Sequence, residues 1–212
     1  AQSYVSEGQP NRDSAVRLML AEPLGQPPGG AFRYSNSNIQ LATAIVEVVS
    51  RLSYQDFAPR ELWSPAGLSA TGFAADQGAK LVAPAVEDTP QRLANRSWGS
   101  EGVYSTANDL FRWFRSLRNG RVLSERSTEQ LFAPVATISE GHSALAWFLG
   151  KSPLGRPLIF TRGNEDFGPN SVLYVYPDRE IVIVVLTHAG NADAQRSWSR
   201  AIHAQIEQLL SL

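Results

Sequence analysis

Cysteine is absent from the 212-residue sequence, and lysine occurs only at Lys80 and Lys151. Without cysteine, the chain can form no disulfide and no thiolate nucleophile, and it cannot bind a metal through thiolates. The other basic side chains are arginines, which keep their proton in proteins. The side-chain amines that could act as a general base are therefore limited to two.

An excess of positive charge is also missing. The sequence contains 19 Lys and Arg against 20 Asp and Glu, which gives a formal net charge of -1. Proteins that bind nucleic acid hold the phosphates with a surplus of positive charge, so we expect no nucleic-acid partner. The histidines at positions 142, 188 and 203 occur singly, without the spacing of a zinc site, so we expect no metal and no cofactor.

Long apolar runs do not occur either. The longest one, residues 181–186 (IVIVVL), is far shorter than the roughly 20 residues of a membrane-spanning helix and suits a buried strand. The first eight residues (AQSYVSEG) are polar and could be a cut end as easily as a true start.

Helical patterns fill the first two-thirds of the sequence. Residues 12–21 and 55–63 predict helices, and a further helix is expected to begin at Ser35 or Asn36. Its expected apolar stripe consists of Leu41, Ile45, Val48, Val49 and Leu52. Thr106 begins another helix, with Asp109 three positions later as in a capping box, and the pair Asn119-Gly120 ends it. Its expected apolar stripe consists of Leu110, Trp113, Phe114 and Leu117.

Strand patterns gather near the end of the sequence. Four short strands are expected at residues 145–150, 158–162, 171–176 and 180–187, followed by a helix over 192–210. Residues 67–98 lack periodicity and predict a long excursion over the surface. We therefore expect one α+β domain over 1–212, with a mainly helical and loop part (1–140) and an antiparallel sheet with a C-terminal helix (141–212).

Three blocks occur in one order along the chain. Residues 28–36 (PGGAFRYSN) resemble the P-G-x-x-F-x-Y-S-N motif of class C β-lactamases, family VIII esterases and D-alanyl-D-alanine carboxypeptidases. Residues 62–72 (LWSPAGLSATG) resemble the P-L-G-M-x-x-T stretch of this superfamily, and 102–110 (GVYSTANDL) resemble its G-x-x-S-T-x-x-D-L segment. The resemblance implies the β-lactamase/penicillin-binding-protein fold, serine hydrolase chemistry and a periplasmic or secreted location.

A fourth point of resemblance is Thr161-Arg162-Gly163, on an expected strand. Related proteins have Lys-Thr-Gly or His-x-Gly here, so only the glycine is retained. The resemblance implies that the backbone N–H of Asn164 donates to the oxyanion hole and that Gly163 leaves room for the substrate. Arg162 could bind a substrate carboxylate through two parallel hydrogen bonds.

The first block supplies the remaining candidate residues. Tyr34 is the candidate catalytic base or proton relay, because a phenol can accept a proton and return it to a leaving group. Asn36 is expected to present its amide to a substrate carbonyl. The alternative interpretations are structural: Tyr34-Ser35-Asn36 as a capping turn, residues 161–163 as a strand end, Ser105-Thr106 as an N-cap and Glu165-Asp166 as a solvated turn.

The S-x-x-K motif of this superfamily, which carries the nucleophile and its lysine, is not found. Gln77 and Phe148 stand three residues before the two lysines, and the serine patterns 14–17 and 197–200 end in arginine. Only 33 residues precede Tyr34, where the superfamily places S-x-x-K well upstream. We therefore expect a truncated domain, without its N-terminal strands and nucleophile helix, that is inactive alone.

Truncation would also affect the partners of the chain. Losing the first strands would expose a sheet edge, so we expect a dimer or a complementing N-terminal fragment, besides a small-molecule or peptide acyl substrate. Two other interpretations stay open: a non-catalytic relative that binds a peptide-like ligand, and an interaction domain that shares only the capping turns.

Overall fold

The computed structural model describes residues 12–73, 99–100, 102–164, 170–187 and 192–210. The chain divides into two compact units, and along the described residues the change from one to the other falls between Ser105 and Thr106. The predicted excursion over 67–98, the pair Glu165-Asp166 and His188 lie wholly or mostly outside the described residues. The prediction of a single domain stays a prediction.

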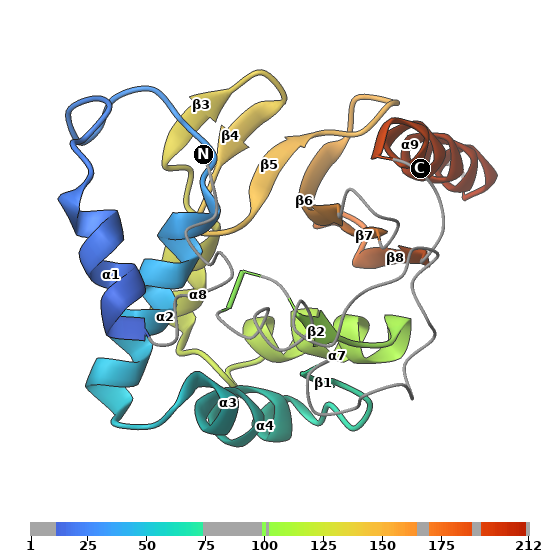
Figure 1. Cartoon of the computed structure of the whole chain (residues 1–212). Helices are drawn as coiled ribbons and strands as arrows, with labels where there is room; N and C mark the ends of the chain where they lie inside the picture. Colours follow the sequence, from blue (N-terminus) through green and yellow to red (C-terminus); the bar gives the residue numbers. More distant parts are fainter. Residues whose placement is uncertain (1–11, 74–98, 101, 165–169, 188–191, 211–212) are drawn as a thin grey trace. The chain divides into compact units, whose positions relative to one another are not determined.

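The first unit is helical, with one small pair of strands (Figure 1). Its helices are α1 (Arg12–Ala21), α2 (Asn36–Ser50), α3 (Tyr54–Phe57), the π-helical segment η1 (Ala58–Trp63) and α4 (Ser64–Ala66). Strands β1 (Gly72–Phe73) and β2 (Val103–Tyr104) pair antiparallel. The helices predicted over 12–21 and 55–63 are confirmed, and the second continues through Ala66, where Gly67 adopts a left-handed conformation with φ 72°.

Helix α2 forms where the sequence predicts it, but the predicted apolar stripe is not its buried face. Ile45, Val48 and Val49 are 64%, 65% and 78% exposed, whereas Gln40 and Thr43 are buried. Gly99 is packed so tightly against Thr43 that a Cβ at this glycine would overlap the threonine hydroxyl. Apolar spacing thus identified the helix, whereas its neighbours within the unit determined which face became buried.

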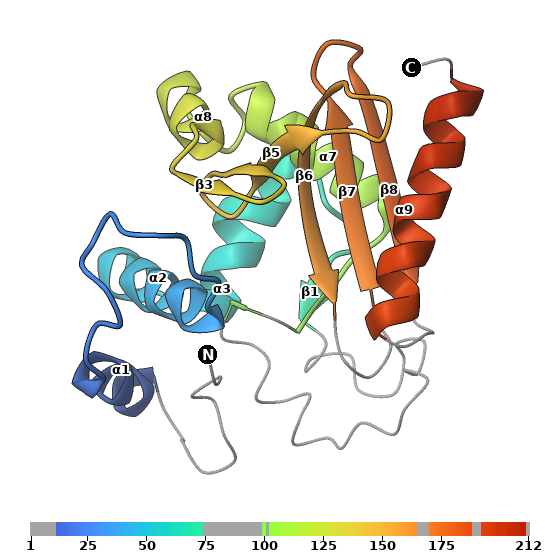
Figure 2. The same cartoon turned by 90° about the horizontal axis from the view of Figure 1, so that it is seen from above.

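The second unit contains a six-stranded antiparallel sheet in the order β3-β4-β5-β6-β7-β8. Its strands are β3 (Ala136–Ile138), β4 (Gly141–Ser143), β5 (Phe148–Lys151), β6 (Pro157–Asn164), β7 (Asn170–Tyr176) and β8 (Ile181–Thr187), and its helices are α7 (Ala107–Arg118), α8 (Glu125–Phe132) and α9 (Ala192–Leu209). Figures 1 and 2 show α7 and α9 on opposite sides of β6, β7 and β8. The arrangement confirms the predicted α+β class.

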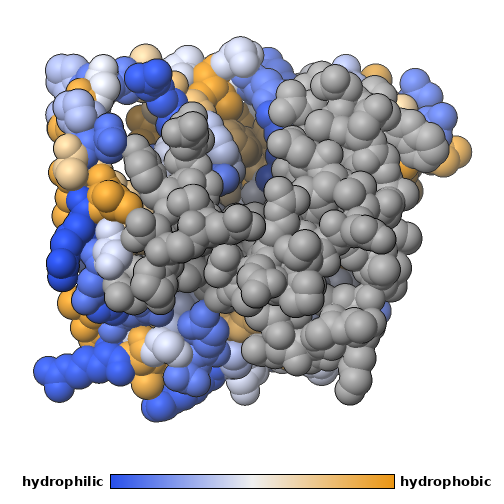
Figure 3. Space-filling view, viewed as in Figure 1, coloured by the Kyte–Doolittle hydropathy of each residue, from blue (hydrophilic) through white to orange (hydrophobic). Residues whose placement is uncertain are grey.

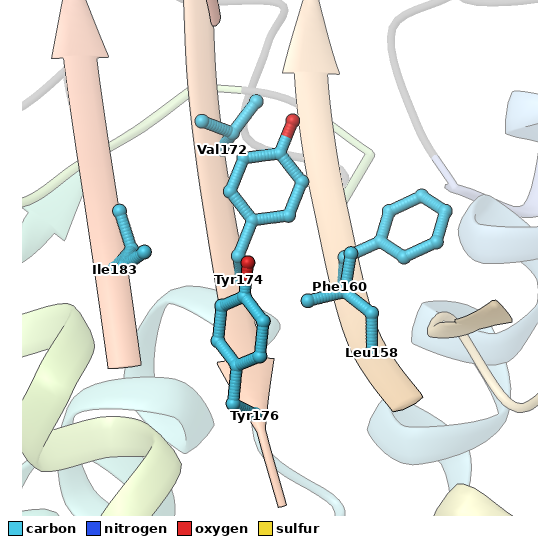
Figure 4. Close-up of a cluster of buried hydrophobic side chains, with 6 residues drawn as sticks. All are labelled: Leu158, Phe160, Val172, Tyr174, Tyr176 and Ile183. Carbon is cyan, nitrogen blue, oxygen red and sulfur yellow. The ribbon is translucent and has the colours of Figure 1, made fainter. Parts of the chain in front are cut away.

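Two apolar clusters hold the helices to the two faces of this sheet. On the face towards α9, Figure 4 shows the first, which consists of Leu158, Phe160, Val172, Tyr174, Tyr176 and Ile183. Ile206 of α9 packs against it. On the other face, Leu173 and Val175 pack with Phe114 and Leu117 of α7. We call these the α9 face and the α7 face; successive strand residues alternate between them.

The ends of α7 follow the sequence closely. The hydroxyl of Thr106 accepts a hydrogen bond from the backbone N–H of Asp109 at 3.2 Å, and the helix ends at Asn119 before Gly120, whose φ is 78°. The predicted apolar stripe of this helix belongs to the α7-face cluster. Both the predicted cap and the predicted stripe are therefore confirmed.

The prediction of the sheet missed some elements. Strands β3 and β4 and helix α8 were not predicted, and β5 begins three residues later than expected. The later start of β5 has a local cause. Ala146 has a positive φ of 62°, and the N–H of Ala144 donates to the carbonyl of Trp147 at 2.7 Å. A turn therefore occupies the first residues of the predicted strand.

On the face drawn in Figure 3, hydrophilic and hydrophobic residues alternate where they are coloured. Among the described helices, none combines the length and apolar character needed to cross a membrane.

Candidate active site

Tyr34 and Asn36 form the candidate site in the first unit. Tyr34 lies just before α2 and is 69% exposed, and its hydroxyl donates to Asn36 Oδ1 at 2.9 Å. Ser35 is the N-cap residue, with extended backbone angles (φ -153°, ψ 127°), but its side chain makes no capping bond. Ser35 therefore is the N-cap residue, as predicted, but its side chain does not accept the hydrogen bond from a backbone N–H that an N-cap serine usually accepts. The tyrosine and the asparagine are held together at the exposed start of the helix.

The Pro/Gly loop before Tyr34 is ordered by its own hydrogen bonds. Gly29 has a φ of 80°, a left-handed conformation that glycine adopts without strain. The N–H of Gly30 donates to the carbonyl of Pro27 at 3.1 Å, and the Gln26 amide donates to the carbonyl of Ala31. These bonds fix the direction from which the chain enters α2.

The second and third resemblance blocks meet in the same unit. Thr71 Oγ1 and Ser105 Oγ are hydrogen-bonded at 2.8 Å, and Gly72 pairs with Tyr104 across β1 and β2. A Cβ at Gly72 would lie 2.6 Å from the Tyr104 hydroxyl, so glycine is required for this approach. The sequence alone did not indicate that these two blocks touch.

Arg162, Gly163 and Asn164 form the candidate site in the second unit, at the end of β6. Strand alternation puts Arg162 on the α9 face, and Thr161 and Gly163 on the α7 face. Consistent with this, Arg162 pairs with Val172 of the α9-face cluster, and Thr161 pairs with Leu173 of the α7-face cluster. Thr161, which the resemblance aligns with a Lys or His of the motif, donates a hydrogen bond to the carbonyl of Ala146 at 3.4 Å.

The guanidinium of Arg162 is held by neighbours in the same unit. Its two terminal nitrogens contact the carboxylate oxygens of Glu140 at 2.6 and 3.3 Å, and it lies 5.7 and 5.6 Å from the ring centres of Phe148 and Phe160. This is the two-pronged geometry that arginine makes with a carboxylate. The carboxylate is one from the protein, and a substrate carboxylate would compete with it.

Gly163 and Asn164 pair with Ser171 and Asn170 of β7. A Cβ at Gly163 would lie 2.8 Å from the Ser171 hydroxyl, so the missing side chain accommodates this neighbouring strand. The roles predicted for Tyr34, Asn36, Arg162, Gly163 and Asn164 in catalysis and substrate binding stay predictions.

A buried polar network in the second unit was not predicted at all. The hydroxyl of Ser152 and the backbone N–H of Leu154 donate to the carboxylate of Glu207, which is fully buried. The Tyr176 hydroxyl is hydrogen-bonded to His203 Nε2, and the His203 ring stacks on Tyr174 with centres 4.0 Å apart. A histidine followed four residues later by a glutamate on the last helix was the available signal, because such residues share one helix face.

Burial dominates the titration of this network. It raises the pKa of Tyr176 to about 12, with a further contribution from the negative charge of Glu207. It lowers the pKa of His203, which Glu207 opposes only in part. The Tyr176 hydroxyl therefore keeps its proton at neutral pH and His203 is neutral, as expected of a structural histidine. In the part of the chain that is described, no three His, Asp or Glu side chains gather as metal ligands.

Comparisons with known proteins give a consistent result. A putative penicillin-binding protein of Bacillus subtilis (strain 168), PbpX, is 25% identical over 142 residues, which are 61% of this chain and 35% of that protein. The penicillin-binding protein structure from Bacillus halodurans matches 91% of this chain and 62% of its own, with a TM-score of 0.73 and 22% identity.

The D-amino acid amidase structure from Ochrobactrum anthropi SV3 has a TM-score of 0.74 and 16% identity over 99% of this chain and 67% of its own. The chain spans about a third of the length of the curated relative PbpX. The structural matches show a shared fold. The beta-lactamase family model matches residues 2–206, so the chain belongs to the beta-lactamase family.

Proposed function

We propose that the chain carries part of the active site of a serine hydrolase that transfers an acyl group from a β-lactam, a D-alanyl peptide or a carboxylic ester. Residues outside these 212 would supply the nucleophilic serine and its lysine, because S-x-x-K does not occur in the sequence. On this proposal the isolated chain is inactive, and a complementing N-terminal fragment completes the site.

The hydrogen bond from Tyr34 to Asn36 is the observation that carries the proposal. Because Asn36 Oδ1 accepts this bond, the NH₂ group of the same amide is oriented by it and is available to donate to a substrate carbonyl. The tyrosine is exposed at the start of α2, so a substrate can reach it.

The proposed reaction divides the work between residues. The oxygen of the serine bonds to the acyl carbon, the bond from that carbon to the leaving group breaks, and Tyr34 passes the serine proton to the leaving group. The backbone N–H of Asn164 would donate to the oxygen that becomes negative in the transition state. Gly163 would keep the adjacent space free.

The substrate class follows from the relatives and is part of the proposal. Their names describe penicillin-binding proteins and a D-amino acid amidase, so the acyl groups concerned include β-lactams and amides of D-amino acids. A β-lactam or a D-alanyl peptide is therefore the first substrate to test.

Covalent labelling tests the proposal. The isolated chain is expected to form no adduct with a fluorophosphonate or a labelled penicillin in intact-mass analysis. A longer polypeptide that adds the upstream S-x-x-K segment is expected to be labelled, and Tyr34→Phe in it should slow labelling by about 10²-fold or more. Asn36→Ala should also slow it, whereas the matched control Asn38→Ala, at an exposed position of α2, should not. An adduct on a serine of the isolated chain would refute the proposal.

A non-catalytic binding domain is the second candidate, and Thr161 is the observation that favours it. Threonine has no amine or imidazole and cannot supply the charge that Lys or His supplies at this position in relatives. This candidate predicts that the longer polypeptide binds a D-amino acid peptide reversibly and is never labelled, even with S-x-x-K present.

A further inference from the structure

A cleft of about 750 Å³ lies on the α9 face of the sheet. The residues that line it all belong to the second unit, and they include the turn at residues 139–140 between β3 and β4, and His203 of α9. Pockets that bind small organic molecules usually have volumes of about 300–1,000 Å³. The cleft is therefore large enough for such a ligand.

Much of the lining of this cleft is apolar. Leu158, Phe160 and Tyr174 belong both to the cleft and to the α9-face cluster (Figure 4). The lining also contains the prolines Pro153, Pro157 and Pro177. Contact with these side chains removes the apolar part of a ligand from water, which is favourable. The cleft therefore favours a ligand with an apolar body.

Gly150 of β5 allows the turn between β3 and β4 to lie close to the sheet. A Cβ at Gly150 would lie 2.5 Å from the carbonyl oxygen of Glu140 and 3.4 Å from the Phe160 ring, so a side chain here would displace the turn. In its present place the turn brings the Glu140 carboxylate to Arg162, with oxygen–nitrogen distances of 2.6 and 3.3 Å. Backbone packing thus places an ion pair in the lining of the cleft.

The charges of the lining favour an anion. Arg162 and Lys151 are positive, whereas Glu140 is the one acidic side chain among the described residues that line the cleft. Arg162 has five N–H donors, and Glu140 accepts from two of them, one on each terminal nitrogen. No carboxylate of a described residue pairs with Lys151. One further carboxylate would balance the two cations.

We propose that this cleft binds a small molecule with an apolar body and a single carboxylate, which Arg162 holds beside Glu140. A guanidinium forms two parallel hydrogen bonds with a carboxylate, and the three N–H groups that Glu140 does not use include one such parallel pair. Glu140 therefore keeps its place when the ligand binds. The apolar body of the ligand lies against Phe160 and Tyr174.

The proposed site is separate from the candidate active site. Tyr34, Asn36, Gly163 and Asn164 are not among the described residues that line the cleft. Thr161 and Gly163 belong to the α7 face, whereas the cleft lies on the α9 face. The ligand is therefore distinct from the acyl substrate, and either proposal can fail without the other.

Titration of the 212-residue chain with 3-phenylpropionate tests the proposal, with backbone amide shifts measured by NMR. We expect one molecule to bind saturably with a Kd of about 1 mM or less, which is ordinary for a ligand of this size. The uncharged 3-phenylpropionamide has the same body, and acetate has the same charge without the body. Each should bind about tenfold more weakly or not at all, because each lacks one of the two features that the cleft recognises. The shifts should lie in residues 149–152 and 158–162.

Two substitutions should change the affinity in opposite directions. Arg162→Gln should weaken the binding of 3-phenylpropionate by about tenfold, because it removes the charged donor. Glu140→Gln should tighten it by about threefold, because it removes a like charge beside the ligand carboxylate. If Arg162 only held the turn in place, both substitutions would break the same ion pair and act in the same direction. Arg121→Gln is the matched control, since Arg121 is exposed between α7 and α8 and does not line the cleft.

Circular dichroism should show that all three variants are folded, as expected for substitutions of exposed or half-buried side chains. The proposal is overturned if 3-phenylpropionate does not bind saturably, or if the amide binds equally well. It is overturned equally if Arg162→Gln leaves the affinity unchanged, if Glu140→Gln weakens binding, or if the shifts lie at Tyr34 and Asn36 instead of the cleft.

Discussion

At the residue scale, His203 is the group with the clearest pH dependence. It lies against Tyr174, Tyr176 and Glu207, and burial lowers its pKa in the folded chain. The unfolded chain, with an ordinary histidine pKa near 6.5, therefore binds more protons than the folded chain just below that pH. We expect the free energy of unfolding to fall as pH falls below about 6.5, by at most about 1.4 kcal/mol per pH unit for this one proton.

Urea unfolding between pH 5 and 8 measures this dependence. His203→Gln should be less stable at pH 8 and should lose the part of the slope that comes from His203. His142→Gln is the control, because His142 is exposed on β4. Equal slopes for the wild type and His203→Gln would contradict the assignment.

Individual site residues were predictable where the signal was local. Tyr34 and Asn36 are two positions apart beside a helix start, and they do contact each other. The position of Arg162 was less predictable, because its partner Glu140 is 22 residues away in the sequence. A strand residue's neighbours on adjacent strands depend on register, which a single sequence does not give.

At the scale of elements, Glu207 connects α9 to the turn between β5 and β6. Its carboxylate accepts hydrogen bonds from Ser152 and Leu154, and both donors belong to that turn. Glu207→Ala would leave the buried Ser152 hydroxyl and the Leu154 N–H without their acceptor, so we expect it to destabilise the chain by about 3 kcal/mol. Gln208→Ala, at the exposed next position, should change the free energy of unfolding by less than about 0.5 kcal/mol. Urea titration distinguishes the two, and equal effects would refute the anchoring role.

Two glycines with positive φ give a second test at this scale. Gly141 has a φ of 133°, and a Cβ there would overlap the carbonyl oxygen of Leu149. Gly155 has a φ of 83° and open space around it. Gly155→Ala should therefore cost only about 1 kcal/mol of backbone strain. Gly141→Ala should cost clearly more, because the β4–β5 pairing must also shift. A thermal unfolding midpoint no lower for Gly141→Ala than for Gly155→Ala would contradict this account.

Elements with strong periodicity were predicted well. Helix α7 was predicted from its capping pair, Thr106 and Asp109, and from its apolar stripe. Strands β6, β7 and β8 were predicted from their apolar runs. Strands β3 and β4 have only three residues each, too few to show a period of two. The buried face of α2 was predicted wrongly. A helical repeat shows which side of a helix is apolar, but it does not show which side other parts of the chain will cover.

At the scale of the whole molecule, the α+β class and the family follow from the order of the elements and the three motif blocks. The spacing of His203 and Glu207 indicates a shared helix face, but their partner Ser152 lies 55 residues from Glu207, and no motif records that contact. The chain covers 62% and 67% of the lengths of the two matched structures.

The alternation of β6 has one more consequence, for how this protein can change. Thr161 and Arg162 are adjacent in sequence but belong to opposite faces of the sheet, and Arg162 is fixed by Glu140 and two aromatic rings. Substitutions at position 161 can therefore accumulate without disturbing the packing around Arg162. The contacts that fix Arg162 therefore set no requirement on the side chain at position 161.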